Sequence, residues 1–154
     1  MTGSVDGDRP PLRAVATDGG DGRSARRFSR AETMALVQGG YFAATGVWPF
    51  VSMRSFEAVT GPKTDRWLVK TVGGLVGVVG GVLIAAGVRR RVTPEVAAMA
   101  AGTAAVLAAI DVVYTARRVI RPVYLADAMG EALLLAGWAR AAQSVAEAEE
   151  SGAS

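Results

Sequence analysis

The sequence predicts an all-α integral membrane protein, a bundle of about four transmembrane helices behind a disordered N-terminal tail. Residues 1–28 hold few aliphatic side chains, whereas residues 29–146 are dominated by Ala, Val, Leu and Gly. Within this second part, apolar runs recur that are long enough to cross a hydrocarbon layer about 30 Å thick. Short arginine clusters flank these runs, a spacing typical of membrane proteins.

Composition excludes several kinds of site. The chain has no Cys and no His, so disulfides, Cys/His zinc sites, His-ligated haem, thiol nucleophiles and Ser-His-Asp triads are excluded. We expect no cofactor and no metal, although carboxylates alone could hold a hard cation. The net charge of +3 does not indicate nucleic acid, because the arginines flank apolar runs.

The segment 1–28 lacks hydrophobic periodicity and cannot bury enough apolar surface to order itself, so we interpret it as a disordered cytoplasmic tail. Its Arg26-Arg27-Phe28 lacks the residue that usually separates the Arg pair from the Phe in a twin-arginine signal. No convincing small-x-small cleavage site follows. The first apolar run is therefore interpreted as an uncleaved span.

The first span is predicted over 33–51. Ser29 and Glu32 have the spacing of a capping box, which starts a helix by satisfying free N–H groups. Trp48-Pro49-Phe50 near its end suits a membrane interface, and the proline should bend or end the helix.

The second span, 67–88, follows a polar connection over 52–66 that contains a Gly61-Pro62 turn signal. Thr64 or Asp65 could cap its helix. After Lys70 the run has no charge up to Val88, which favours a membrane span over a buried soluble helix.

The third span, 95–115, begins at Thr93-Pro94-Glu95, which supplies a cap, a proline at the first helical position and an acid in the first turn. A fourth span is predicted over 123–142, and residues 147–154 form a short, frayed acidic tail. Glu131 lies near the middle of this span, where a carboxylate costs about 2.5–3.5 kcal/mol. The alternative is three spans with an interfacial last helix.

With the N-terminus inside, more Lys and Arg lie on the cytoplasmic side than on the other. The positive-inside rule thus favours a multi-pass protein with both termini in the cytoplasm. The Ala-, Arg-, Gly- and Val-rich composition suits a GC-rich bacterium, so we expect a bacterial inner (plasma) membrane.

Glycines recur through the second span. Gly73, Gly77 and Gly81 lie four apart on one ridge, a small-xxx-small pattern that lets helix backbones approach closely. Gly39 offers a shorter groove on the first helix. We expect packing within the monomer; the alternative is a homodimer or a membrane-protein partner.

A polar cluster is predicted at one depth of the bundle. Its candidate residues are Lys70, Asp111, Tyr114, Tyr124, Asp127 and Glu131. In an alternating topology they fall near the same side of the membrane, and ionisable groups there should face a partner or a watery cavity. The cluster is either a structural ion-pair network, with Lys70, Arg118 or Arg121 as cations, or a pocket for a ligand head group, a cation or a proton.

A second polar stripe lies on the first helix. Gln38, Tyr41 and Thr45 are spaced i, i+3, i+7 and share a face. We expect this stripe to hydrogen-bond a neighbouring helix.

The stretch from Gly39 to Gly74, together with Asp111-x-x-Tyr114 and Tyr124-x-x-Asp127-x-x-x-Glu131, resembles a group of uncharacterised small four-span bacterial membrane proteins. The resemblance covers about residues 33–140 and implies a topology but no activity. Intramembrane acids in a four-helix bundle are also similar to sterol-isomerase and sigma-2-receptor-type proteins, although no motif matches theirs residue by residue.

We expect a non-enzymatic module in contact with membrane lipid that responds to a small ligand or an ion. The alternative is a structural or accessory subunit that binds another membrane protein through its glycine-rich faces. A membrane enzyme would have to work with Asp, Glu, Lys and Tyr alone.

Overall fold

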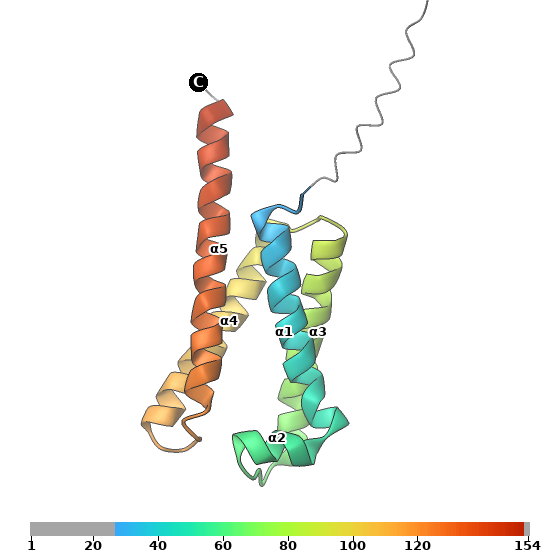
Figure 1. The fold of residues 1–154 in the computed structure, drawn as a ribbon, viewed down its shortest axis with the longest axis vertical. Helices are drawn as coiled ribbons and strands as arrows, with labels where there is room; N and C mark the ends of the chain where they lie inside the picture. Colours follow the sequence, from blue (N-terminus) through green and yellow to red (C-terminus); the bar gives the residue numbers. More distant parts are fainter. Residues whose placement is uncertain (1–26, 153–154) are drawn as a thin grey trace, which may run out of the picture.

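The computed structural model describes the backbone of residues 27–152 and the side chains of residues 27–143. This part of the chain is all-α, with five helices and no strand (Figure 1). The helices are α1 (Arg30–Val51), α2 (Met53–Thr60), α3 (Arg66–Val88), α4 (Pro94–Ala116) and α5 (Tyr124–Gly152). The predicted tail lies almost entirely outside the described residues.

The four long helices run alternately up and down, and α2 lies across one end of the bundle (Figure 1). The most extensive packing joins α1 to α3, followed by α4 to α5, and α5 also contacts α1. The ends of α1 and α4 and the starts of α3 and α5 therefore lie at the end covered by α2. We call this the α2 end. The opposite end, where α1 and α4 start and Arg30 lies, is called the arginine end.

Two predicted helix starts are confirmed. Ser29 and Glu32 form the capping box: the Ser29 hydroxyl accepts from the Glu32 N–H at 3.1 Å, and the Glu32 carboxylate accepts from the Ser29 N–H at 2.8 Å. At the start of α4, the Thr93 hydroxyl accepts from the Val96 N–H at 3.4 Å, and Pro94 takes the first helical position. These local signals act within one turn and need no tertiary contact.

The connection between the first two predicted spans is more ordered than expected. Met53–Thr60 forms α2, whose cap is Ser52. The Ser52 hydroxyl accepts from the Ser55 N–H at 3.3 Å, and Trp48 donates to the Ser55 hydroxyl at 2.8 Å. The short helix is thus held against the end of α1.

The last helix is longer than the predicted span. It continues past residue 142 to Gly152, so the segment that we expected to be a frayed tail has a helical backbone over 147–152. Its Ala- and Glu-rich sequence explains this, because both residues are strong helix formers.

The glycine contact has a different register from the one expected. A Cβ on Gly80 would lie 2.6 Å from the Ala43 nitrogen, and one on Gly73 would lie 2.7 Å from the Gly46 oxygen. Gly39 likewise faces α3, but Cβ atoms on Gly77 and Gly81 would meet nothing within 4 Å. The α3 glycines at which a Cβ would collide with α1 therefore recur every seven residues, and the Gly77 backbone also lies against Gly46. This period belongs to left-handed packing, whereas the four-residue ridge belongs to right-handed crossings.

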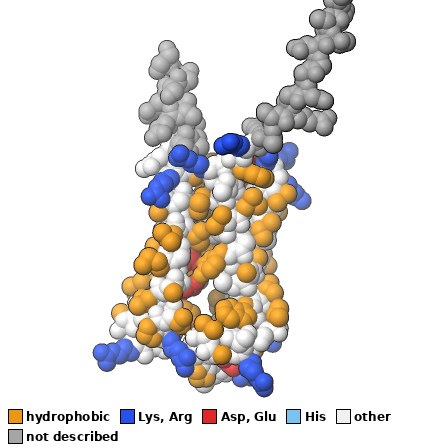
Figure 2. All heavy atoms as spheres, in the orientation of Figure 1, with side chains coloured by type: hydrophobic (Ala, Val, Ile, Leu, Met, Phe, Trp, Pro, Cys, Tyr) orange, Lys and Arg blue, Asp and Glu red, His pale blue; other side chains and the backbone are white. Residues whose placement is uncertain are grey.

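The bundle has few buried apolar residues and an apolar outer surface. Small and large apolar residues fill its core at Ala35, Leu83, Ala100 and Trp138. Many large apolar side chains instead point outward along the whole length of the helices, while Lys and Arg gather at the two ends (Figure 2). Among the helices of the described part of the chain, α3 and α4 are long and apolar enough to span a membrane.

Candidate functional site

Three carboxyl groups come together in the half of the bundle nearest the α2 end. Asp111 projects from α4, and Asp127 and Glu131 project from successive turns of α5. Asp111 is 6% exposed and Glu131 is 1% exposed. Both aspartates are close enough to Glu131 to act electrostatically on its carboxylate. Acidic side chains are visible in the seam between apolar groups in Figure 2.

The first helix closes this group of acids from the other side. The Tyr41 hydroxyl on α1 donates a hydrogen bond to Asp127 Oδ1. One turn after Asp111 on α4, Thr115 adds a hydroxyl. We call Tyr41, Asp111, Thr115, Asp127 and Glu131 the acid cluster.

Three buried oxygens of the acid cluster have no hydrogen-bond partner. They are Asp111 Oδ2, Thr115 Oγ1 and Glu131 Oε2. A buried polar atom without a partner costs about 1–3 kcal/mol, and an unpaired buried charge costs more. Each of these oxygens could accept a hydrogen bond or coordinate a cation, so the cluster has the chemistry of a cation or proton site.

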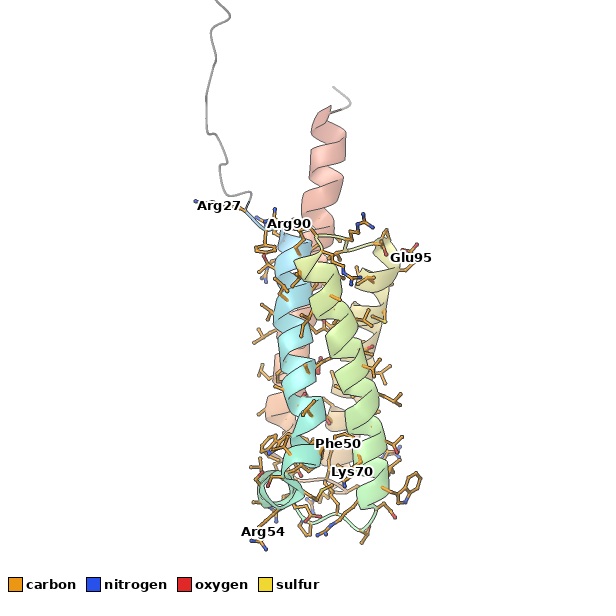
Figure 3. The ribbon with its side chains drawn as sticks, turned by 90° about the vertical axis from the view of Figure 1, so that its right-hand side faces the viewer. Arg27, Phe50, Arg54, Lys70, Arg90 and Glu95 are labelled. Carbon is orange, nitrogen blue, oxygen red and sulfur yellow. The ribbon has the colours of Figure 1, made fainter. Side chains whose placement is uncertain are left out.

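The cations of the expected ion-pair network do not reach these acids. Lys70 is exposed at the α2 end (Figure 3) and forms no ion pair with the part of the chain that the structure describes. Arg121 lies against Gly61 instead. The ion pair that the structure contains near this end joins Arg66 to Glu57 at 2.8 Å.

The two tyrosines predicted for the cluster also lie elsewhere. Tyr114 is exposed, with 41% of its surface accessible. Tyr124 is half-buried, and the Lys63 ammonium lies 5.0 Å from its ring centre. Among the described residues, neither tyrosine forms a hydrogen bond with the three acids; Tyr124 instead lies under Lys63.

Residues 27–143 offer no group of three or more acidic side chains with the arrangement of a metal site. The acid cluster therefore does not have the geometry of a site with three or more acidic ligands. A proton, which binds to a single oxygen, does not need such an arrangement.

A separate polar junction joins three helices nearer the arginine end. Gln38 on α1 is fully buried; its amide donates to the Ala100 oxygen on α4 at 2.8 Å and accepts from Trp138 Nε1 on α5 at 2.6 Å. The expectation that the stripe of Gln38, Tyr41 and Thr45 bonds to neighbouring helices is confirmed for its first two residues. Thr45 bonds to the Tyr41 oxygen of its own helix.

An apolar hollow lies beside this junction. It has a volume of about 720 Å³ and lies between the start of α4 and the later turns of α5, lined mainly by Ala, Val, Leu and Pro. The Trp138 side chain forms part of its wall, but its N–H is already bonded to Gln38. This hollow suits an apolar group and offers little to orient a polar ligand.

Sequence reasoning missed Tyr41 and Thr115 as members of the acid cluster. Tyr41 carried a signal, since it belonged to a polar stripe assigned to helix contacts. Thr115 follows Asp111 at i+4, so it shares the helix face of that acid. That spacing could have identified it.

Comparisons with protein-family models, with curated proteins and with solved structures find no match. The acid cluster and the apolar exterior must therefore be interpreted from their own geometry and chemistry.

Proposed function

We propose that the chain is a multi-pass membrane protein in which α1, α3, α4 and α5 all span the bilayer. The apolar character of α3 and α4 supports this, together with the outward-facing apolar side chains of all four helices. The 22 residues of α1 extend about 33 Å at 1.5 Å per residue, close to the thickness of the hydrocarbon layer.

The polar residues that lower the hydropathy of α1 and α5 support the same topology, because they face inward. Gln38 and Glu131 are almost fully buried, and Asp127 bonds to Tyr41. A carboxylate costs much less to insert when it faces the bundle interior than when it faces lipid. This favours a spanning α5 over an interfacial one.

Arginines at both ends mark the proposed membrane boundaries. Figure 3 shows Arg27 and Arg90 at one end, and Arg54 and Lys70 at the other. The positive-inside rule favours the arginine end as the cytoplasmic one. At that end α1 starts and α5 ends, so both termini would be cytoplasmic. The resemblance to small four-span bacterial proteins supports an inner-membrane location.

We infer that the acid cluster makes this protein an ion-responsive module whose ligand is a small monovalent cation or a proton. One observation carries this function: Asp111 and Glu131 are buried together, each has an oxygen without a partner, and no described cation compensates them. A bound cation or proton would remove the cost of burying these charges.

The test is thermal unfolding of the full chain in detergent, in sodium, potassium, ammonium or N-methylglucamine chloride at equal ionic strength. A ligand at about 100 times its Kd stabilises the folded state by about 2.7 kcal/mol. We expect at least one small cation to raise Tm above the value in N-methylglucamine. Glu131→Gln should abolish that increase without lowering the basal Tm, because it removes an unpaired buried charge.

Glu95→Gln is the matched control, since Glu95 is an exposed acid in the first turn of α4. This variant should keep the cation response. If Glu131→Gln responds to cations as the wild type does, the acid cluster is not the binding site. A wild type that ignores all small cations, and whose pH dependence Glu131→Gln leaves unchanged, would contradict the proposal altogether.

The alternative function is an accessory subunit that binds another membrane protein. It is supported by Gly81 on α3, which is exposed and whose Cβ direction is open. Crosslinking in native membranes tests it: Gly81→Leu should remove a crosslinked partner or dimer band and leave the folded monomer intact.

A further inference from the structure

A small hollow lies between the first turns of α1 and the later turns of α5, at the arginine end. Its volume is about 340 Å³, and its lining is Phe28, Arg30, Thr33, Met34, Gly137 and Arg140. It is separate from the acid cluster, which lies toward the opposite end of the same helices.

The charge of this hollow is positive. Two guanidinium groups, Arg30 and Arg140, line it from different helices, and no carboxylate is among its lining residues. The nearby Glu32 carboxylate already accepts the Ser29 N–H. Arg90 brings further positive charge, since its guanidinium lies 4.6 Å from the centre of the Phe28 ring. An anion placed here would meet cations from two helices, α1 and α5.

The inner wall of the hollow is apolar. Met34 packs directly against Gly137, so α1 and α5 approach closely at this level. One turn further toward the middle of the bundle, Val37 and Leu133 are 54% and 67% exposed. A ligand that fills the hollow with a negative group could therefore lay a hydrocarbon chain along these two side chains.

Two of the arginines at the α2 end have partners within the protein. Arg66 is paired with Glu57, and Arg121 lies against Gly61. The two arginines of the hollow instead flank a space large enough for a phosphate group. Guanidinium groups bind phosphate through parallel N–H···O bonds, and basic pockets between helices on the cytoplasmic side bind anionic lipid head groups.

We propose that this hollow binds an anionic phospholipid, with its phosphate between Arg30 and Arg140 and an acyl chain against Val37 and Leu133. The inference rests on the membrane location proposed above, because only a membrane-embedded bundle would present the hollow at the level of lipid head groups. It is independent of the ligand of the acid cluster.

The experiment measures thermal unfolding of the full chain in detergent with added phosphatidylglycerol, phosphatidylcholine or inorganic phosphate. We expect phosphatidylglycerol to raise Tm and the other two to leave it nearly unchanged. The Arg30→Gln/Arg140→Gln variant should bind phosphatidylglycerol at least tenfold more weakly. The control is Arg54→Gln/Arg117→Gln, which removes two exposed arginines at the α2 end and should bind as the wild type does.

Three results would overturn the inference: equal stabilisation by phosphatidylcholine, equal stabilisation by inorganic phosphate, or full retention of phosphatidylglycerol binding in Arg30→Gln/Arg140→Gln. If that variant fails to fold, Arg30→Lys/Arg140→Lys keeps both charges but removes the planar forks. It should still lose affinity, and unchanged affinity would contradict the phosphate site.

Fractionation of cells separates this inference from the proposed function. Recovery of the wild type in the soluble fraction would contradict the membrane location and the lipid site together. Recovery in the membrane fraction without preference for phosphatidylglycerol would overturn only the lipid site.

Discussion

At the scale of single residues, a buried amide and several glycines determine how the helices contact one another. Gln38 bonds to α4 and α5 at once, so one amide holds three helices in register. Glycines do the equivalent for α1 and α3, because the absence of a side chain at Gly46 and Gly80 lets the two backbones touch. The Gln38 hydrogen bonds and the glycine contact each lead to a prediction.

The first prediction concerns Gln38→Leu. The substitution removes two buried hydrogen bonds and leaves the Trp138 N–H without a partner, which should cost about 1–3 kcal/mol. Thermal unfolding in detergent measures the loss. Adding Trp138→Phe removes the unpaired donor and should recover part of the stability. Additive losses in the double variant would mean that the two side chains are not coupled.

The second prediction concerns the register of the glycine contact. Gly80→Leu should destabilise by about 1–3 kcal/mol or more, since its Cβ would meet the backbone of α1. Gly81→Leu, one residue away, should have little effect on the unfolding of the monomer because its Cβ direction is open. Equal losses for the two variants would show that the close approach does not follow the seven-residue period.

At the scale of elements, side-chain caps start α1, α2 and α4, and an ion pair holds the connection between α2 and α3. Arg66 Nε and Nη2 donate to the two Glu57 oxygens at 2.9 and 2.8 Å, and the Lys63 N–H donates to the same carboxylate at 3.3 Å. The Arg66 hydrogen bond, above all, holds the pKa of Glu57 below its usual value. Partial burial of the carboxyl acts in the opposite direction.

The third prediction follows from the lowered pKa of Glu57. The unfolded state binds a proton more readily than the folded state, so the contribution is complete above the usual Glu pKa of about 4.3. This contribution of the Glu57 carboxylate to the stability of the connection is lost as the pH falls through the lowered pKa. Glu57→Gln should therefore accelerate amide exchange over residues 61–65 at pH 7, and the difference from the wild type should shrink on acidification. A difference that stays constant with pH would contradict this account.

At the scale of the whole molecule, the apolar surface between two charged ends determines how the bundle meets its surroundings. Large apolar side chains on α1, α3, α4 and α5 point outward, whereas the interior holds Gln38, Asp111 and Glu131. The outer face thus differs from that of a soluble helical bundle, which carries charged groups there.

The fourth prediction concerns topology. Reporter fusions after residues 60, 91, 119 and 150 should alternate sides of the membrane, starting outside, because each long helix reverses the direction of the chain. The fusions after 119 and 150 are decisive for α5. If they report the same side, the last helix does not span, and its inward-facing acids belong to a helix at the membrane surface.

The sequence by itself determined the long helices, most of their starts and the concentration of arginine at their ends. These features depend on apolar run length and on caps such as Ser29 and Thr93, which act within one turn. It also indicated that Asp111, Asp127 and Glu131 lie at the same end of the bundle, since alternating helices fix depth.

Only the tertiary structure decided what faces these acids. Depth along a helix can be counted from its ends, but rotation about the helix axis is set by packing against neighbours. A Cβ would collide with α1 at Gly73 and Gly80 but not at Gly77, and α1 directs Tyr41 toward Asp127. Lys70, at the expected depth, points outward. Successive residues of a helix point in directions about 100° apart. A small rotation of α3 therefore decides whether Lys70 faces the acids as an ion-pair partner or leaves them unpaired.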